Sequence, residues 1–547
     1  MMMKRSEETP WTFPFPSDRS RPLPPLLPLP RTRPAILIQP AAAFPTSPTA
    51  PSQHTTMQWP ATDSQRATLR AYAADNAARM CFCRSSPLPS FGHAEGLARA
   101  VEQQAFAFAE ASKSTTTGTR EASETLRLYL KKAGELLVQA VKDAAESLSA
   151  MEAAPAEEGS FDVSAGAREF IMGSAARERF ADAISKAGVR RLKLGNKSYD
   201  VEAAGVIAEV CRVNCETLEE LDMADVLAGR PEEEAMEVLG TIARGVAELC
   251  SIRRLDVSDN ALGEKGIRAL APLLQSQKCL ECVKFQNNGV SAAAAAAIHE
   301  LLVAPEQLRE VHLHNNMAGD EGATSVAALV ARAPRLSKLR MTATRVGEDG
   351  GRALLEALAS LPDASLEHLE LTDNMISEEN GLAIARVVLK HGACLRHLLV
   401  GDTGLGAPGI AAICLALRRT GAPALERVNF AQNEVSVRGA TRIVVALGAA
   451  PSLTTLGLAD NMELGERGAL VLAKAMNDGA FPALEQIDVS RCQLRGGEGQ
   501  VALEAVCSSR GIRVVNEKDD DEEEEDFDDE EEEEEEDFDE SELEAQL

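Results

Sequence analysis

Apolar and polar residues recur along most of the chain in units of nearly constant length. Each unit opens with a short alternation of apolar and polar residues, as in the stretch from Leu366 to Leu371, and a polar residue such as Asn374 follows three positions later. The second half of a unit, for example from Gly263 to Leu274, has apolar residues three and four positions apart. Alternation predicts a strand with one buried face, and the wider spacing predicts a helix.

The alternating segment fits the template L-x-x-L-x-L-x-x-N/C, with a spacing of 28 to 31 residues between the clear copies. Nine clear copies begin at Ile252, Leu280, Leu308, Leu336, Leu366, Leu395, Leu425, Leu453 and Leu484, and two degenerate ones at Val189 and Leu218. This template is that of leucine-rich repeats.

A narrow strand on the inside and a wide helix on the outside force a stack of such units to curve. We therefore expect an α/β horseshoe of the ribonuclease-inhibitor type, with parallel strands on its concave face. Leu255, Val257, Val311 and Leu313 should face its core.

Composition changes along the chain and predicts four regions. Residues 1–57 are rich in proline, which removes backbone donors, so we expect them to be disordered. Residues 58–150 have helical spacing of apolar residues and predict a small all-α domain, and residues 160–515 hold the repeats. Residues 516–547 form an acidic tail that we expect to be disordered.

The negative charge of the protein is concentrated in this tail. Of the net charge of −29 over 547 residues, −22 falls on residues 517–547, where 23 acids stand beside one lysine, which leaves −7 for the other 516 residues. Such a tail can act as a solubilising segment or can attract a basic partner surface.

Aromatic residues make up only 4% of the chain, which favours a core of many similar aliphatic layers.

Several kinds of chemistry have no motif in this sequence. The eleven cysteines are scattered, and the close sets that begin at Cys81, Cys211 and Cys279 lack a second pair at zinc-finger spacing, so we expect reduced thiols in a cytosolic protein. No apolar run is long enough for a membrane-spanning helix, and there is no nucleophile elbow, P-loop or zinc-protease motif. The chain is therefore not expected to have an active site, a metal centre or a cofactor of its own.

One segment, from Gly404 to Gly409, matches the G-x-G-x-x-G pattern of dinucleotide-binding loops. It lies in register with the repeats, however, and Pro408 lacks the N–H that a phosphate-binding loop needs. A nucleotide-dependent oxidoreductase is therefore the weakest of the functional alternatives.

The turns after the strands hold the remaining candidate residues. The asparagine at the end of each template can pair with backbone groups where the chain leaves the strand, so we expect it to be structural. The residue before it, which is Asp259, Asn287, Asn315 or Asp373 in four of the copies, is not required by this scheme and should face solvent. His312 and His314 flank Leu313 and should both lie on the solvated concave face, where they can contact a partner.

Three blocks of the repeat region resemble the family of Ran GTPase-activating proteins. They are the segment around Gly229 and Arg230, the segment from Ser258 to Asn260, and the segment from Leu313 to Asn316, and they occur in that order and spacing. The resemblance covers roughly Phe161 to the end, including the acidic run after the repeats.

Residues 59–144 are similar to the plant WPP domain, which in that family brings the protein to the nuclear envelope. Trp59 and Pro60 match the motif that names the domain, whereas Ala61 stands where the motif has a second proline. The resemblance implies a coiled-coil anchor protein at the nuclear envelope as the partner of residues 58–150. It also implies that the chain resides in the cytoplasm and on the cytoplasmic face of the envelope.

The resemblance further implies that the partner is Ran in its GTP form and that GTP hydrolysis is stimulated in trans without an arginine finger. Asn315 would orient the glutamine of the GTPase, Arg230 would support this edge, and Asp259, His312, His314 and Asp373 would contact the partner. Neither a nucleic acid partner nor insertion into a membrane is expected. The alternative from another class is a protein-binding scaffold that does not affect catalysis.

Overall fold

The computed structural model describes residues 159–247 and 252–516, together with Lys132 and residues 545–547. The proline-rich segment, the expected WPP-like domain and nearly all of the acidic tail lie outside the described residues, so their predictions are not tested. No helix within the described ranges is long and apolar enough to cross a membrane.

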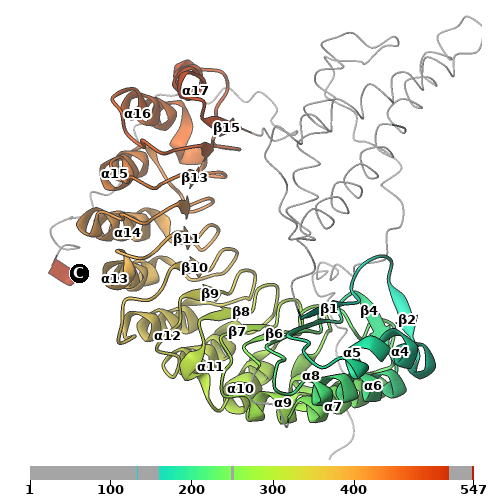
Figure 1. Cartoon of the computed structure of the whole chain (residues 1–547). Helices are drawn as coiled ribbons and strands as arrows, with labels where there is room; N and C mark the ends of the chain where they lie inside the picture. The colour runs from blue at the N-terminus through green and yellow to red at the C-terminus, as the bar shows by residue number, and fades with distance from the viewer. Residues whose placement is uncertain (1–131, 133–158, 248–251, 517–544) are drawn as a thin grey trace, which may run out of the picture. The chain divides into compact units, whose positions relative to one another are not determined.

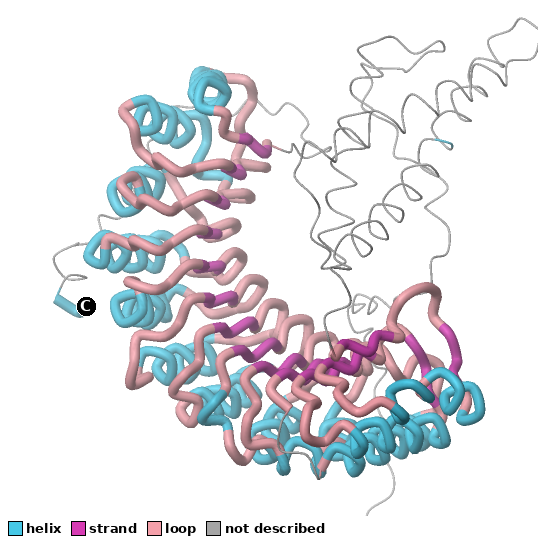
Figure 2. The backbone as a smooth tube through the Cα atoms, viewed as in Figure 1, coloured by secondary structure: helices cyan, strands magenta, loops and turns pink. Residues whose placement is uncertain are grey.

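The described repeats form one parallel sheet on the inner side of a curved array (Figures 1 and 2). Its thirteen strands, each three residues long, pair in chain order. They are β1 (Ser160–Asp162), β3 (Arg191–Lys193), β5 (Glu220–Asp222), β6 (Arg254–Asp256), β7 (Cys282–Lys284), β8 (Glu310–His312), β9 (Lys338–Arg340), β10 (His368–Glu370), β11 (His397–Leu399), β12 (Arg427–Asn429), β13 (Thr455–Gly457), β14 (Gln486–Asp488) and β15 (Arg513–Val515). A separate pair, β2 (Glu169–Ile171) and β4 (Lys197–Tyr199), lies near the N-terminal end of the array.

Helices cover the outer side, and Figure 2 shows them as a second layer behind the row of strands. They are α4 (Gly173–Arg179), α5 (Ala181–Ser185), α6 (Val201–Val213), α7 (Glu232–Val246), α8 (Gly263–Ala269), α9 (Ala271–Ser276), α10 (Ala292–Leu301), α11 (Gly319–Val330), α12 (Glu348–Ala359), α13 (Gly381–His391), α14 (Gly406–Thr420), α15 (Val437–Leu447), α16 (Gly465–Asn477) and α17 (Glu498–Arg510). Short 3₁₀ turns occur at Pro305–Gln307, Glu378–Asn380 and Met462–Leu464. The helix expected from Gly263 to Leu274 is broken into α8 and α9, because Pro272 cannot continue a regular helix.

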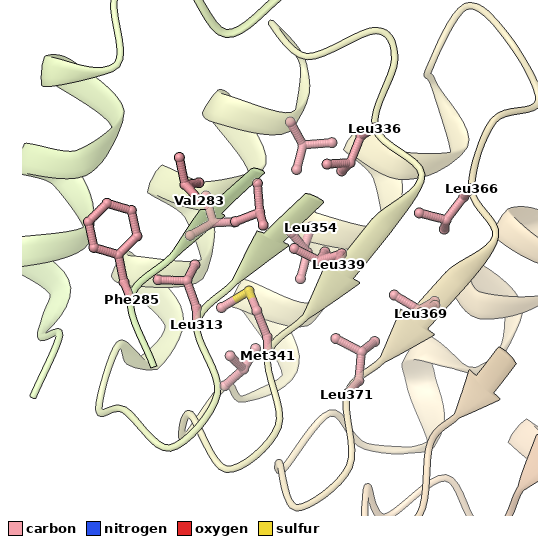
Figure 3. Close-up of a cluster of buried hydrophobic side chains, with 14 of the residues drawn as sticks. Val283, Phe285, Leu313, Leu336, Leu339, Met341, Leu354, Leu366, Leu369 and Leu371 are labelled. Carbon is pink, nitrogen blue, oxygen red and sulfur yellow. The ribbon is translucent and has the colours of Figure 1, made fainter. Parts of the chain in front are cut away.

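The core lies between the sheet and the helices, as the apolar template predicted. The middle residue of each of the eleven template strands is buried, and these residues pair in register from one strand to the next, for example Val311 with Leu339 and Leu339 with Leu369. Leu255, Val257, Val311 and Leu313 are each at most 1% exposed, which confirms their expected orientation. Figure 3 shows how side chains from successive repeats form one continuous layer.

The buried residue that ends each clear template, which we call the ladder residue, joins its repeat to the one before it. It is an asparagine in six repeats, and Thr344, Thr403 and Cys492 take its place in the other three. Asn316 Nδ2 donates to the carbonyl oxygens of Leu313 and Phe285 at 2.6 and 3.0 Å, while its Oδ1 accepts from the backbone N–H groups of Asn288 and Val290. Because Asn316 is only 7% exposed, this one amide satisfies backbone groups that would otherwise be buried without partners. The structural role predicted for the template asparagines is confirmed.

Both ends of the sheet differ from the sequence prediction. All eleven template copies form strands, but β1 precedes the first copy and β15 follows the last. Neither end strand has the full template, because an end strand contacts only one neighbouring repeat. Sequence matching to the template therefore missed them.

The glycine-rich segment from Gly404 to Gly409 is explained by turn geometry and by helix packing. Gly404 and Gly406 have positive φ values of 65° and 58°, whereas Gly409 lies at a contact between helices. Gly406 begins α14, and a Cβ added to Gly381 of α13 would lie 2.3 Å from the Cα of Gly409. Two glycines facing each other thus let the backbones of α13 and α14 approach closely.

Candidate functional site

The turn that follows each of the eleven template strands places one exposed or partly exposed residue at the edge of the concave face, just before the buried ladder residue. We call the residues at this position the turn row. All of its members have a positive φ, between 50° and 60°. They are Asn196, Asp225, Asp259, Asn287, Asn315, Ala343, Asp373, Asp402, Gln432, Asp460 and Arg491.

This backbone conformation corrects one sequence expectation. We expected the position to be free of structural requirements, but it lies in the left-handed region, where asparagine and aspartate are favoured over other residues with a side chain. The many Asn and Asp residues of the turn row therefore reflect the turn itself. Functional candidates must be distinguished by their contacts rather than by residue type.

Three neighbours in the turn row are distinguished by such contacts. Asn315 Nδ2 donates to Asn287 Oδ1 at 3.0 Å, and Asn287 Nδ2 donates to Asp259 Oδ1 at 2.8 Å. All three residues are exposed, as the sequence predicted. The side chains thus form a short hydrogen-bonded chain along the edge of the sheet, which orients Asn315.

Asn315 is the last amide of this chain because Ala343 follows it in the turn row and has no polar side chain. Its Oδ1 accepts no hydrogen bond from any residue that the structure describes, and one hydrogen of its Nδ2 also remains available. An amide held on one side and open on the other can donate to and accept from a second amide without adding charge.

The two members of the turn row that follow Ala343, Asp373 and Asp402, are both acidic. Asp373 is exposed, and its backbone N–H donates to the carbonyl oxygen of Gly401 at 3.0 Å. The pKa of Asp402 is raised by burial and by the nearby charges of Asp373 and Asp460. This part of the edge therefore offers negative charge to a basic surface.

The two histidines do not form the solvated surface that the sequence predicted. His312 is only 6% exposed, because the outward side chains of Lys284 and Arg340 on the adjacent strands lie in register with it. Its ring lies against Glu310, with Nε2 and Oε2 3.2 Å apart. His312 is therefore covered by its neighbours on the concave face and exposes little of its ring to a partner.

His314 is partly buried, and its Nδ1 has no hydrogen-bond partner in the part of the chain that is described. Burial, reinforced by the positive charge of Arg340, lowers the pKa of His314 to about 4. The residue is therefore neutral at pH 7, and a partner that covers it would meet an uncharged ring.

Arg230 is not a free side chain. Its Nε donates to Ser198 Oγ at 3.0 Å, its Nη1 lies 3.0 Å from Glu234 Oε1, and its guanidinium lies 5.5 Å from the centre of the Phe170 ring. Only 8% of the side chain is exposed. These contacts join the loop between β5 and α7 to strands β2 and β4.

Arg230 and Asn315 are consequently separate features of the structure. They follow β5 and β8, which are three strand intervals apart in the sheet, or about 14 Å. The contacts of Arg230 described above do not include Asn315. The structure therefore does not explain how Arg230 would support the edge near Asn315.

Sequence reasoning missed a polar cluster in the middle of the concave face. Arg340 Nε and Thr342 Oγ1 donate to Glu370 at 2.6 and 2.7 Å, and His368 Nε2 lies 3.2 Å from the same carboxylate. Burial alone would raise the pKa of Glu370, but the hydrogen bonds from His368 and Arg340 hold it well below its usual value. The sequence contained a signal for this cluster, because its polar residues occupy the outward positions of the alternating strand pattern.

Comparisons with known proteins agree with the repeat architecture and with the resemblance. A family model described as Leucine Rich repeat matches residues 248–271. The chain is 34% identical over 225 residues to RAN GTPase-activating protein 1 of Arabidopsis thaliana, a match that covers 41% of this chain and 42% of that protein. It is 32% identical over 169 residues to RAN GTPase-activating protein 2 of the same plant, covering 29% and 31%.

The aligned segments thus span less than half the length of these curated relatives. Among solved structures, a chain from the Rad7 and Elc1 complex in yeast matches with a TM-score of 0.40 and 13% identity, and covers 59% of this chain and 74% of that one.

Proposed function

We propose that this chain stimulates GTP hydrolysis by the small GTPase Ran and acts in trans, without an active site of its own. The observation that carries the proposal is the 34% identity, over 225 residues, to a plant protein named as a Ran GTPase-activating protein. The hydrogen-bonded and partly open amide of Asn315, at the exposed edge of the sheet, supports it.

The chemistry of Asn315 suits the task. Small GTPases hydrolyse GTP slowly alone because the attacking water and the glutamine that orients it are not held in place. The open oxygen and hydrogen of the Asn315 amide can pair with the amide of that glutamine, while Asn287 fixes the other side of Asn315. The activator would then supply positioning rather than charge.

No arginine finger is part of this proposal. Arg230 is held by Ser198 and Glu234, and extending it into a partner would break these contacts. We assign it a supporting role in fixing the loop between β5 and α7. Asp259 and Asp373 are exposed at the same edge of the sheet and would contact basic residues of the partner.

A single-turnover assay tests the activity directly. Ran loaded with GTP should hydrolyse it at least about 10²–10³ times faster when the full-length chain is added, since one preorganised contact to the transition state contributes on this scale. A second small GTPase from another family serves as the control and should not respond.

The same assay distinguishes the scaffold alternative. A scaffold would bind Ran in its GTP form and leave the rate of hydrolysis unchanged. Binding without acceleration would therefore replace the proposed activity with that of a non-catalytic binding protein, and absence of both would remove Ran as the partner.

We also propose that residues 58–150 bring the chain to the cytoplasmic face of the nuclear envelope by binding a coiled-coil anchor protein. The full-length chain fused to a fluorescent protein should then collect at the nuclear rim in plant cells, and Trp59→Ala should disperse it because it removes the aromatic residue of the motif. A diffuse signal from the unmutated fusion would contradict this localisation.

A further inference from the structure

Three side chains with metal-binding atoms meet on the concave face, away from the turn row. The Sγ of Cys282, a carboxylate oxygen of Glu310 and a ring nitrogen of His312 all lie within 4.8 Å of one another. Cys282 and Glu310 are register partners on β7 and β8, and His312 lies two residues further along β8. Adjacent strands therefore bring together residues that are 28 positions apart in the sequence.

We propose that Cys282, Glu310 and His312 bind a zinc ion. Ligand atoms around a tetrahedral zinc lie about 3.3 to 3.8 Å apart, given Zn–N and Zn–S bonds of about 2.0 and 2.3 Å. The three atoms lie within 4.8 Å of one another, so no separation has to shorten by more than roughly 1 to 1.5 Å to reach this spacing. Three protein ligands leave the fourth position for water.

The types of the ligands select the metal. A thiolate and an imidazole favour zinc over calcium and magnesium, which prefer sites made of oxygen atoms alone. Binding replaces the proton of the Cys282 thiol, so that a Zn–S bond forms as the S–H bond breaks and the proton passes to solvent.

The surroundings orient these ligands. Arg254 Nη1 lies 3.3 Å from Glu310 Oε1, which leaves Oε2 directed at His312 at 3.2 Å. Such outer contacts fix the direction of a ligating carboxylate. Cys282 and His312 are 1% and 6% exposed, so a bound ion would lose most of its hydration to the protein.

Two adjacent cations pair with other carboxylates, whereas Arg254 and Lys338 both contact Glu310 itself. Lys284 pairs with Asp256 at 3.0 Å, and Arg340 pairs with Glu370 at 2.6 Å. Lys338 Nζ lies 3.7 Å from Glu310 Oε2, the oxygen that a metal would bind. Lys338 therefore competes directly with the ion.

Cys279 provides a matched control. It forms the C-x-x-C spacing with Cys282 in the sequence, yet it is not part of the three-residue cluster, and both thiols are free. A site built on the sequence motif would need Cys279, whereas the site proposed here does not.

The test uses the full-length chain, stripped of metal by a chelator and kept reduced. Cobalt serves as a spectroscopic probe and zinc is titrated in competition with a coloured chelator. We expect one equivalent of cobalt to give a thiolate charge-transfer band that Cys282→Ser abolishes and Cys279→Ser preserves. His312→Ala should weaken zinc binding at least about tenfold, since loss of even an outer contact costs about 10–100-fold.

Two further measurements test the same zinc site. Lys338→Gln should tighten zinc binding about three- to tenfold, because it removes a like charge beside the ion. Zinc should raise the melting temperature of the wild-type chain and not that of Cys282→Ser, as expected for a ligand that binds only the folded state.

Absence of a thiolate band, or its persistence in Cys282→Ser, would overturn the proposal, as would a requirement for Cys279. None of these measurements involves a GTPase, so their result is independent of the activity proposed above.

Discussion

Asn315→Ala is expected to slow stimulated GTP hydrolysis by Ran about 10²–10³-fold, the usual cost of losing one preorganised contact to the transition state. Ran binding should persist, because Asn315 is only one of several exposed side chains along this edge of the sheet. The measurement is single-turnover hydrolysis at saturating activator, together with the affinity for Ran in its GTP form.

The structure predicts a small loss of stability for the same variant. Asn315 has a φ of 57°, which favours asparagine over alanine, but Ala343 adopts a φ of 52° at the same position of the next repeat. The cost should therefore remain below about 1 kcal/mol. Gln432→Ala is the matched control, since Gln432 is an exposed member of the turn row, and it should leave both rate and stability unchanged.

Two outcomes would count against the assignment of Asn315. Near-normal hydrolysis would leave it as an ordinary residue of the turn row. A comparable loss in Gln432→Ala would show that the assay responds to any change along this edge. Arg230→Ala should reduce the rate far less than the about 10³–10⁵-fold that an arginine finger contributes.

Asn316→Ala is expected to destabilise the protein by about 3 kcal/mol and to reduce activity only as folded protein is lost. The variant leaves the backbone N–H groups of Asn288 and Val290 without their acceptor, and three carbonyl oxygens lose their donor. Each buried group left unpaired costs about 1–3 kcal/mol, although water that enters the space recovers part of this.

Thermal and urea unfolding, read as midpoints because repeat arrays need not unfold in one step, measure this loss. Asn374→Ala is the control at the same position two repeats further on, where the side chain makes the corresponding bonds to Met341 and Leu371. It should cost a similar amount. A normal melting point for Asn316→Ala with a severe loss of rate would transfer the functional role from Asn315 to Asn316.

The sequence by itself determined the repeat fold, its core and its ladder. Leu255 and Val311 could be placed in the core, and Asn316 at the ladder, because each repeat packs only against its neighbours and the pattern of one unit fixes its local structure. The exposure of Asn315 followed from the same pattern. The left-handed turn also had a signal, since Asn and Asp recur at the position before the ladder, but we attributed these residues to the absence of a constraint.

Only the tertiary structure decided which outward side chains meet. Arg230 is held by Ser198 and lies near Met172, which are 32 and 58 residues away in the sequence, and no repeat template contains that information. The burial of His312, and its meeting with Cys282 and Glu310, depend on how β7 and β8 align. Outward positions vary freely from copy to copy because the core does not constrain them, so their contacts are set by strand register and by the curvature that crowds them together.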